Sequence, residues 1–153
     1  MNTIAYWWAT IVETLLRMLP FPTRTGLVAV GHPNAESPVL LTCNFHLTVE
    51  RVKRALQGLD CLPLVANSRG VNVWCAATGG LLTNHDIISV LKTSGIAERV
   101  QRRQVILPQL AATGIDGKLI RQKTGWRVNW GPVEAEDIPA FLANSHHKTA
   151  AIR

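Results

Sequence analysis

The chain is short of several features that define common protein classes. Charged residues make up only 17% of its 153 residues and aromatic residues 6%, whereas 47% are hydrophobic, a composition that excludes a disordered chain. The apolar stretch over residues 1–19 carries two charges and lacks both a basic leader and a small-residue cleavage site. We therefore expect neither a membrane span nor a signal peptide, and one domain with a sizeable core.

Motifs that identify several enzyme classes are missing as well. The chain has no Gly-x-Gly-x-x-Gly fingerprint, no P-loop and no nucleophile elbow. Its three cysteines, Cys43, Cys61 and Cys75, show no Cys-x-x-Cys spacing, so the sequence does not predict a four-ligand zinc site. An odd number of cysteines without a secretory signal indicates a reducing compartment, and we predict a cytoplasmic protein.

The charges that are present are mostly basic. Sixteen lysines and arginines against 10 acidic residues give a net charge of +6. Such an excess is typical of proteins that bind nucleic acid, an anionic membrane surface or phosphorylated ligands. The chain has no basic helix and no alternation of aromatic and basic residues, so we expect no nucleic-acid partner. The pairs Lys53-Arg54 and Arg102-Arg103 are predicted to lie on solvated faces.

Strand patterns alternate with helix patterns along most of the chain, which predicts an α/β fold. Strands are expected at residues 27–30, 39–43, 61–66, 104–107 and 126–130. Helices are expected at residues 49–59 with Thr48 as the cap, at 86–94 with Asn84 as the cap, and at 115–124 and 137–143. We predict a Rossmann-like single domain over residues 23–153, with a central sheet flanked by helices, preceded by an amphipathic helix within residues 1–22.

The first 19 residues have a helical pattern in which large apolar residues recur: Ile4, Trp7, Trp8, Ile11, Leu15 and Leu19. Two interpretations are open. The helix packs on the domain, or it presents Trp7 and Trp8 to a membrane surface or a partner. In both cases Pro20-Phe21-Pro22 ends the helix.

The functional information is concentrated in residues 70–80, Gly-Val-Asn-Val-Trp-Cys-Ala-Ala-Thr-Gly-Gly. This stretch follows the strand expected at 61–66, and ligands of open α/β sheets bind beyond the carboxyl ends of strands, where we expect residues 67–80 to lie. Cys75 is expected near the start of a short helix, where the helix dipole favours the thiolate that binds metals. The alternative is structural, with Cys75 as a small buried residue and Trp74 in the core. Gly79-Gly80 lets a flat ligand approach the backbone closely.

The six residues Asn72-Val73-Trp74-Cys75-Ala76-Ala77 resemble the signature of the corrinoid-binding domain of the mercury-methylation corrinoid protein family. That family is a relative of the corrinoid iron–sulfur protein large subunit of the acetyl-CoA pathway. The similarity covers about residues 27–153, in blocks at residues 38–42, 105–110, 124–128, 131–133 and 137–142. In one place the chain departs from the pattern: the family's motif continues Gly-Lys-Gly, whereas this chain has Thr78-Gly79-Gly80 and no lysine.

The resemblance implies a cobalamin cofactor held by residues 72–80. Cys75 would be the lower axial ligand of the cobalt, in place of the cofactor's own benzimidazole base. The residues implied to contact the cofactor with it are Asn72, Val73, Trp74, Ala76, Ala77, Thr78, Gly79 and Gly80. A thiolate is a strong anionic donor, and the axial ligand is a main means by which a protein tunes a macrocycle-bound metal, an argument made for haem that we extend to cobalt by analogy.

The implied function is that of a methyl carrier, a corrinoid-dependent methyltransferase component that passes a methyl group from cobalt to an acceptor, by resemblance inorganic mercury(II). The implied partners are a folate-type methyl donor protein and a ferredoxin-like iron–sulfur reductant. The reductant must be a separate protein because this chain has no cysteine cluster for an iron–sulfur centre of its own. One alternative is a non-catalytic relative that binds the corrinoid but has lost methyl transfer. Another is a small α/β domain with a buried Cys75 and no cofactor.

Overall fold

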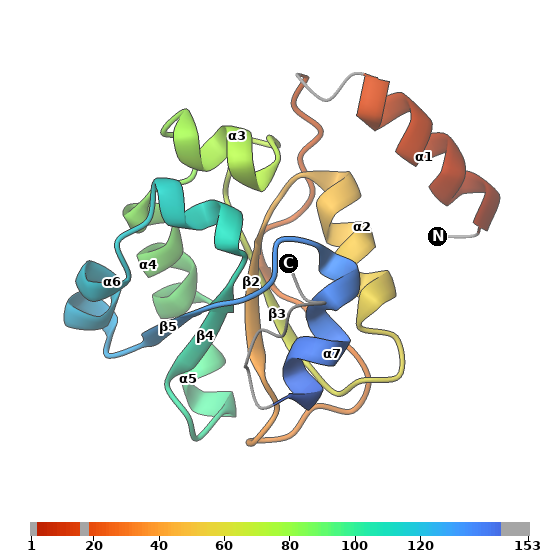
Figure 1. Ribbon diagram of the computed structural model, residues 1–153. Helices are drawn as coiled ribbons and strands as arrows, with labels where there is room; N and C mark the ends of the chain where they lie inside the picture. The colour runs from red at the N-terminus through yellow and green to blue at the C-terminus, as the bar shows by residue number, and fades with distance from the viewer. Residues whose placement is uncertain (1–2, 16–18, 145–153) are drawn as a thin grey trace.

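A five-stranded sheet forms the centre of the computed structural model, which describes residues 3–15 and 19–144 (Figure 1). The strands are β1 (Gly26–Leu27), β2 (Val39–Cys43), β3 (Leu62–Ala66), β4 (Gln104–Leu107) and β5 (Arg127–Trp130), in the spatial order β1-β3-β2-β4-β5. The strands β2 to β5 are parallel to one another, and β1 pairs with β3 in the antiparallel sense. The predicted α/β class with a central sheet is confirmed.

Helices cover both faces of this sheet. On one face lie α4 (Asn84–Thr93), α5 (Ile96–Arg99) and α6 (Gly117–Thr124), and on the other lie α2 (His46–Ala55) and α7 (Ile138–Ala143) (Figure 1). A short helix, α3 (Val73–Thr78), packs on the 3-10 turn η1 (Gln109–Thr113). A second 3-10 turn, η2 (Ala135–Asp137), leads into α7, and α1 (Thr3–Leu15) lies beside α2.

The two faces of the sheet contribute to two separate cores. The central strands are buried on both sides, as unbroken apolar runs such as Val-Leu-Leu-Thr-Cys in β2 predict. Alternate residues point in opposite directions, so Leu41 and Leu107 join a larger core with α4, α5 and α6. Leu40 and Ile106 join a smaller core with α2 and α7.

The predicted strands match the structure best where the apolar run is continuous. Those at 39–43 and 104–107 are confirmed residue for residue. The prediction for 27–30 is wrong in extent, because the strand covers only Gly26–Leu27 and Val30 makes an isolated antiparallel bridge to Cys61.

The predicted start of α2 is wrong. The helix begins at His46, ahead of the expected cap Thr48, and no side chain caps it. The backbone N–H of His46 donates instead to the carbonyl oxygen of Phe21 at 2.8 Å. This helix start is therefore satisfied by a segment distant in sequence, which sequence patterns do not reveal.

The predicted cap of α4 is also wrong. Thr83 is the cap, and its side chain forms a reciprocal capping box with Asp86. The expected cap, Asn84, is the first residue of the helix, and its side-chain oxygen accepts from the backbone N–H of Asp116 at 2.8 Å. Asn84 thus joins the start of α4 to the start of α6.

Helix α1 touches α2 along one narrow side, where the Arg54 guanidinium lies 3.7 Å from the centre of the Tyr6 ring. Its apolar residues face outward: Trp8 is 66% and Leu15 79% exposed. The same holds for Ile4, Trp7 and Ile11. The helix therefore packs on the domain on the side of Tyr6, while its large apolar residues face away from the domain. Residues 16–18 of the expected helix lie outside the described residues. Within the described ranges, no helix is long and apolar enough to span a membrane.

Candidate functional site

Residues 67–80 lie beyond the carboxyl end of a central strand, as the sequence predicts. Strand β3 ends at Ala66, a loop follows, and α3 lies over the same end of the sheet (Figure 1). In the parallel pair, Cys43 at the end of β2 is the register partner of Ala66. The segments that follow β2 and β3 therefore meet at this edge of the sheet.

Helix α3 is six residues long, and hydrogen bonds close both of its ends. At its start, the Asn72 side chain accepts from the backbone N–H of Cys75 at 3.1 Å. At its end, the backbone N–H of Gly79 donates to the carbonyl oxygen of Cys75 at 2.9 Å. The backbone of Cys75 is thus held from both sides, although a helix this short has little stability of its own.

The structure divides the predicted site residues of α3 into two groups. The inward group is Val73, Ala76 and Ala77, which are buried. The outward group is Trp74, Cys75 and Thr78, of which Trp74 is 54% exposed and Cys75 is half-buried. The alternative that Trp74 belongs to the core and Cys75 is fully buried is therefore wrong.

Glycines at two positions shape the surroundings of α3. A Cβ atom on Gly114, the residue after η1, would collide with the carbonyl oxygen of Ala77, so the backbones of α3 and of this turn approach each other too closely for a side chain at this position. At the other end, no atom outside Gly80 and its two chain neighbours lies within 4 Å of the place where a Cβ on Gly80 would stand. The outer side of the loop after α3 is therefore open.

Cys75 is the accessible thiol among the three cysteines. Burial raises the pKa of the Cys43 thiol, and burial together with the Asp60 carboxylate raises the pKa of Cys61 to about 11. In the described part of the chain, no three His, Cys, Asp or Glu side chains come together as a metal site. Cys75 therefore offers a single ligand, which fits a metal ion whose other positions a macrocycle fills.

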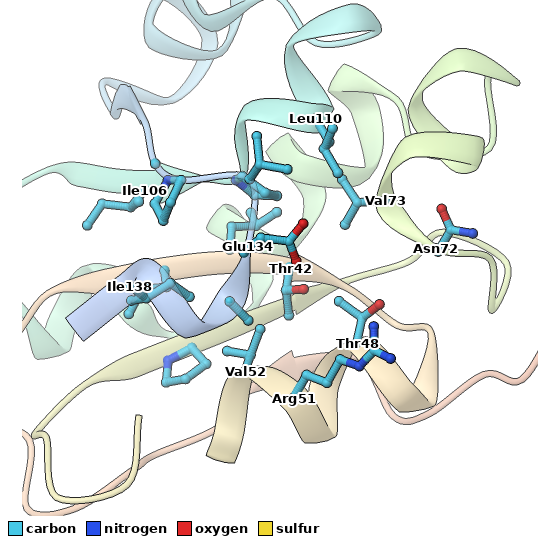
Figure 2. Close-up of a pocket in the computed structure, with 18 of the residues that line it drawn as sticks. Thr42, Thr48, Arg51, Val52, Asn72, Val73, Ile106, Leu110, Glu134 and Ile138 are labelled. Atoms are coloured by element: carbon cyan, nitrogen blue, oxygen red, sulfur yellow. The ribbon is translucent and has the colours of Figure 1, made fainter. Parts of the chain in front are cut away.

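A cleft of about 260 Å³ opens beside the start of α3, on the face of the sheet that α2 and α7 cover (Figure 2). Much of its lining is apolar and includes Leu40, Val52, Pro63, Ile106, Leu110, Pro132 and Ile138. Polar groups come from Thr42, Thr48, Arg51 and Glu134. Asn72, Val73 and Trp74 line the cleft from α3, whereas Cys75 does not.

The sequence does not predict this cleft. Its lining comes from segments far apart along the chain, which include β2, α2, β3, α3, β4, η1 and residues 131–138. No motif connects Thr48, Arg51 and Glu134. The signal that the sequence does contain is the block at 131–133, which belongs to the family resemblance and lines the cleft.

An ion pair ties the loop before α3 to the start of α4. The guanidinium of Arg69 donates to the carboxylate of Asp86 at 3.0 Å, and the Asp86 side chain is only 8% exposed. Burial by itself raises the pKa of Asp86, but hydrogen bonds from Thr83 and Arg69 together outweigh it and hold that pKa below its ordinary value. Asp86 is thus an anion that serves both the loop and the helix.

The family model for the CO dehydrogenase/acetyl-CoA synthase delta subunit matches residues 13–142, a span that includes the whole of α3. The chain belongs to this family. The resemblance to acetyl-CoA pathway subunits is thereby confirmed. Most of α1 precedes the segment that the delta subunit family shares with this chain.

Individual relatives of the delta subunit family agree with this assignment. The acetyl-CoA decarbonylase/synthase complex subunit gamma of Methanothermobacter thermautotrophicus is 37% identical over 119 residues, 76% of this chain and 26% of that protein. The gamma subunit of Methanopyrus kandleri is 33% identical over 125 residues, 80% of this chain and 27% of that protein. Subunit gamma 2 of Methanosarcina mazei is 35% identical over 127 residues, with the same coverage. The chain spans about a quarter of the length of these curated relatives.

Proposed function

We propose that this chain is the corrinoid-binding domain of a methyl carrier, with the Cys75 thiolate as the lower axial ligand of the cobalt. The observation that carries the proposal is the single accessible thiol of α3, at the carboxyl end of the sheet and within the segment shared with the delta subunit family. When bound, the cobalt centre supplies the position that carries a methyl group.

The residues around Cys75 have distinct parts in this proposal. Cys75 donates its sulfur, and Asn72 fixes its backbone through the 3.1 Å hydrogen bond. The exposed indole of Trp74 offers an apolar surface for a flat macrocycle. Thr78, Gly79 and Gly80 leave the far end of the helix free of bulky side chains. Val73, Ala76 and Ala77 act from the inner side by seating α3 on the core.

The base that sulfur ligation displaces needs a place of its own. The largely apolar cleft beside Asn72 and Trp74 is the proposed place, and its volume of about 260 Å³ is close to the lower end of the range for small-molecule sites, roughly 300 Å³. Arg51 supplies a cation at this cleft, which suits the anionic tail of the cofactor in a chain that lacks the motif lysine.

As the methyl acceptor we propose inorganic mercury(II), because the six residues 72–77 resemble the signature of the mercury-methylation family. With the corrinoid bound, the methyl group would pass to mercury(II) together with its bonding electrons, and a folate-type donor protein would resupply it as a methyl cation. The cofactor would therefore need two electrons from an external donor in each turnover. A ferredoxin-like iron–sulfur protein is the proposed donor.

A second candidate function is methyl transfer within an acetyl-CoA decarbonylase/synthase complex. It is favoured by the curated relatives, whose names place them in such a complex. A third candidate is a non-catalytic corrinoid-binding relative, favoured by Thr78-Gly79-Gly80 in place of the lysine-containing motif. Methyl transfer to mercury(II), measured with the corrinoid-loaded chain and a chemical reductant, separates the first function from the other two.

The proposed cofactor is tested by anaerobic titration of the chain with a cobalamin, followed by its visible spectrum. We expect a base-off, sulfur-ligated spectrum that Cys75→Ala abolishes and that Thr93→Ala, a change at an exposed residue of α4 outside the site, leaves intact. No base-off spectrum in the wild type contradicts corrinoid binding. A spectrum that survives Cys75→Ala removes Cys75 as the ligand but keeps the cofactor.

We also propose that α1 lies on an anionic membrane surface. Its exposed apolar side includes Trp7 and Trp8, and tryptophan favours the membrane interface. Single apolar residues are common on protein surfaces, but here several large ones are exposed on the same helix. The net charge of +6 favours a membrane surface with anionic lipid headgroups.

Sedimentation with lipid vesicles tests this surface. We expect the chain to sediment with phosphatidylglycerol-containing vesicles more than with pure phosphatidylcholine. The double change Trp7→Ala, Trp8→Ala should release it, and Thr14→Ala, on the same helix, should not. Equal binding to both vesicle types, or a dimer in solution that depends on Trp7 and Trp8, contradicts the proposal.

A further inference from the structure

We propose that Asn44 is a positioning residue for the Cys75 thiol and acts by anchoring the loop that leads into α3. Asn44 directly follows β2 and is buried. Its side-chain oxygen accepts hydrogen bonds from the backbone N–H groups of Ser68 at 2.9 Å and Gly70 at 3.0 Å. Because only the oxygen of an amide accepts from N–H donors, these contacts fix the orientation of the Asn44 side chain.

Asn44 also binds a third segment of the chain. Its side-chain nitrogen donates to the carbonyl oxygen of Thr23 at 3.3 Å, and its backbone carbonyl accepts from the Thr23 N–H at 2.8 Å. The Phe21 N–H in turn donates to the carbonyl oxygen of Gly70 at 2.9 Å. Asn44 therefore holds together the end of β2, residues 21–23 and the loop before α3.

The anchored loop has an unusual backbone. Arg69 has a φ of 60° and Gly70 a φ of 73°, so two successive residues are left-handed, and Arg69 is the one non-glycine residue with positive φ in the described ranges. A non-glycine residue keeps this strained backbone conformation where contacts with surrounding residues hold it in place. Here the surroundings are Asn44 on one side and Asp86, bound to Arg69 at 3.0 Å, on the other.

The path from this anchor to the thiol is short. The Ser68 hydroxyl donates to the carbonyl oxygen of Val71 at 2.7 Å, and the next residue, Asn72, caps the Cys75 N–H at 3.1 Å. Only Val71 separates Gly70 from this cap. A shift of the loop is passed on to Cys75 because α3 is too short to hold its own position.

Hydrogen exchange on the full chain measures this role without a cofactor. Asn44→Ala removes the acceptor, and Asn44→Asp keeps an oxygen in its place. The control is Asn34→Ala, since Asn34 accepts from the Glu36 N–H at 2.8 Å in an exposed turn. We expect Asn44→Ala to speed exchange at Ser68, Gly70 and Cys75 by about tenfold while β4 keeps its protection. Asn44→Asp should restore most of the protection, and Asn34→Ala should change none of it.

The rate at which the Cys75 thiol is alkylated gives a second test of the role of Asn44. We expect iodoacetamide to alkylate Cys75 at a clearly different rate in Asn44→Ala than in the wild type and in Asn34→Ala, as followed by peptide mapping. Unchanged alkylation and unchanged exchange at Cys75 overturn the proposal. An equal loss of protection in β4 overturns it too, because it shows a general effect on stability.

The functional importance of holding Cys75 in place rests on the proposed function. A cobalamin titration tests the role of Asn44 and the proposed function separately. If the wild type binds a corrinoid, Asn44→Ala should still bind it but lose the sulfur-ligated spectrum, as Cys75→Ala does. Full sulfur ligation in Asn44→Ala overturns the positioning role. If the wild type binds no corrinoid, the proposed function fails, while the exchange and alkylation results still decide the role of Asn44.

Discussion

At the scale of single residues, Cys75 differs from the other cysteines in its surroundings. Cys43 and Cys61 are strand-associated and fully enclosed, and no partner in the described residues turns them into a metal site. Cys75 lies on the outer side of α3. Its backbone N–H donates to Asn72 at the start of the helix, and its carbonyl oxygen accepts from Gly79 at the end. A sulfur that is both accessible and held in place is what an axial metal ligand requires.

This difference predicts selective chemistry. In the native chain at pH 8, iodoacetamide should alkylate Cys75 at least about tenfold faster than Cys43 or Cys61, because burial hides both of these and raises the pKa of Cys61 to about 11. In urea all three should react alike. Mass mapping of the alkylated peptides measures the rates, and similar native rates for the three thiols would contradict the structure.

Asp86 should make the stability of the chain depend on pH. Its pKa in the folded chain is below the ordinary 3.8, so its contribution is complete above that value and is lost as the pH falls through the lowered pKa. We expect Asp86→Asn to reduce the free energy of unfolding by about 1–3 kcal/mol at pH 7, because it leaves Arg69 and Thr83 without a charged acceptor. The difference should shrink below about pH 4.

Urea unfolding of the wild type and Asp86→Asn between pH 7 and pH 3 gives this comparison. Glu98→Gln, a change at an exposed carboxyl group, serves as the control and should alter stability by less than about 0.5 kcal/mol. A difference between wild type and Asp86→Asn that stays constant on acidification would rule out the charged pair as its cause.

At the scale of elements, the sequence is informative where burial follows a simple period. The alternation over residues 126–130 predicts that Trp126, Val128 and Trp130 share a face, and all three pack toward the larger core. Helix starts are less predictable because tertiary contacts can satisfy their N–H groups, as Phe21 does for His46. The sequence also predicts a short helix with Cys75 near its start, and α3 confirms it, with Asn72 as the cap that accepts from the Cys75 N–H.

The departure from the family motif can be tested within α3. A Cβ on Gly79 would stand 2.8 Å from the carbonyl oxygen of Cys75, so any side chain at this position strains the end of the helix. Gly79→Lys restores the motif's cation together with this strain, and Gly79→Ala introduces the strain alone. If the missing cation limits methyl transfer to mercury(II), the lysine variant should be about tenfold faster than the alanine variant. Equal rates would remove the lysine from the explanation.

At the scale of the whole molecule, the topology of the sheet determines where residues 67–80 lie, and the packing of helices on the sheet forms the cleft beside them. The alternation of strands and helices is enough to predict that residues 67–80 lie at the carboxyl ends of parallel strands. The cleft beside them is not predictable in this way, because Arg51, Glu134 and Ile138 meet only once α2 and α7 have packed on the same face. The outward direction of the apolar side of α1 is likewise a result of packing, since Tyr6 is the side chain that meets Arg54 of α2.

The central claim is a bond between the Cys75 sulfur and cobalt, and X-ray absorption at the cobalt edge measures it directly. The corrinoid-loaded wild type should show one sulfur atom in the first coordination shell of cobalt, and the loaded Cys75→Ala variant should show only nitrogen or oxygen there. A wild-type complex with no sulfur bound to cobalt would contradict the account.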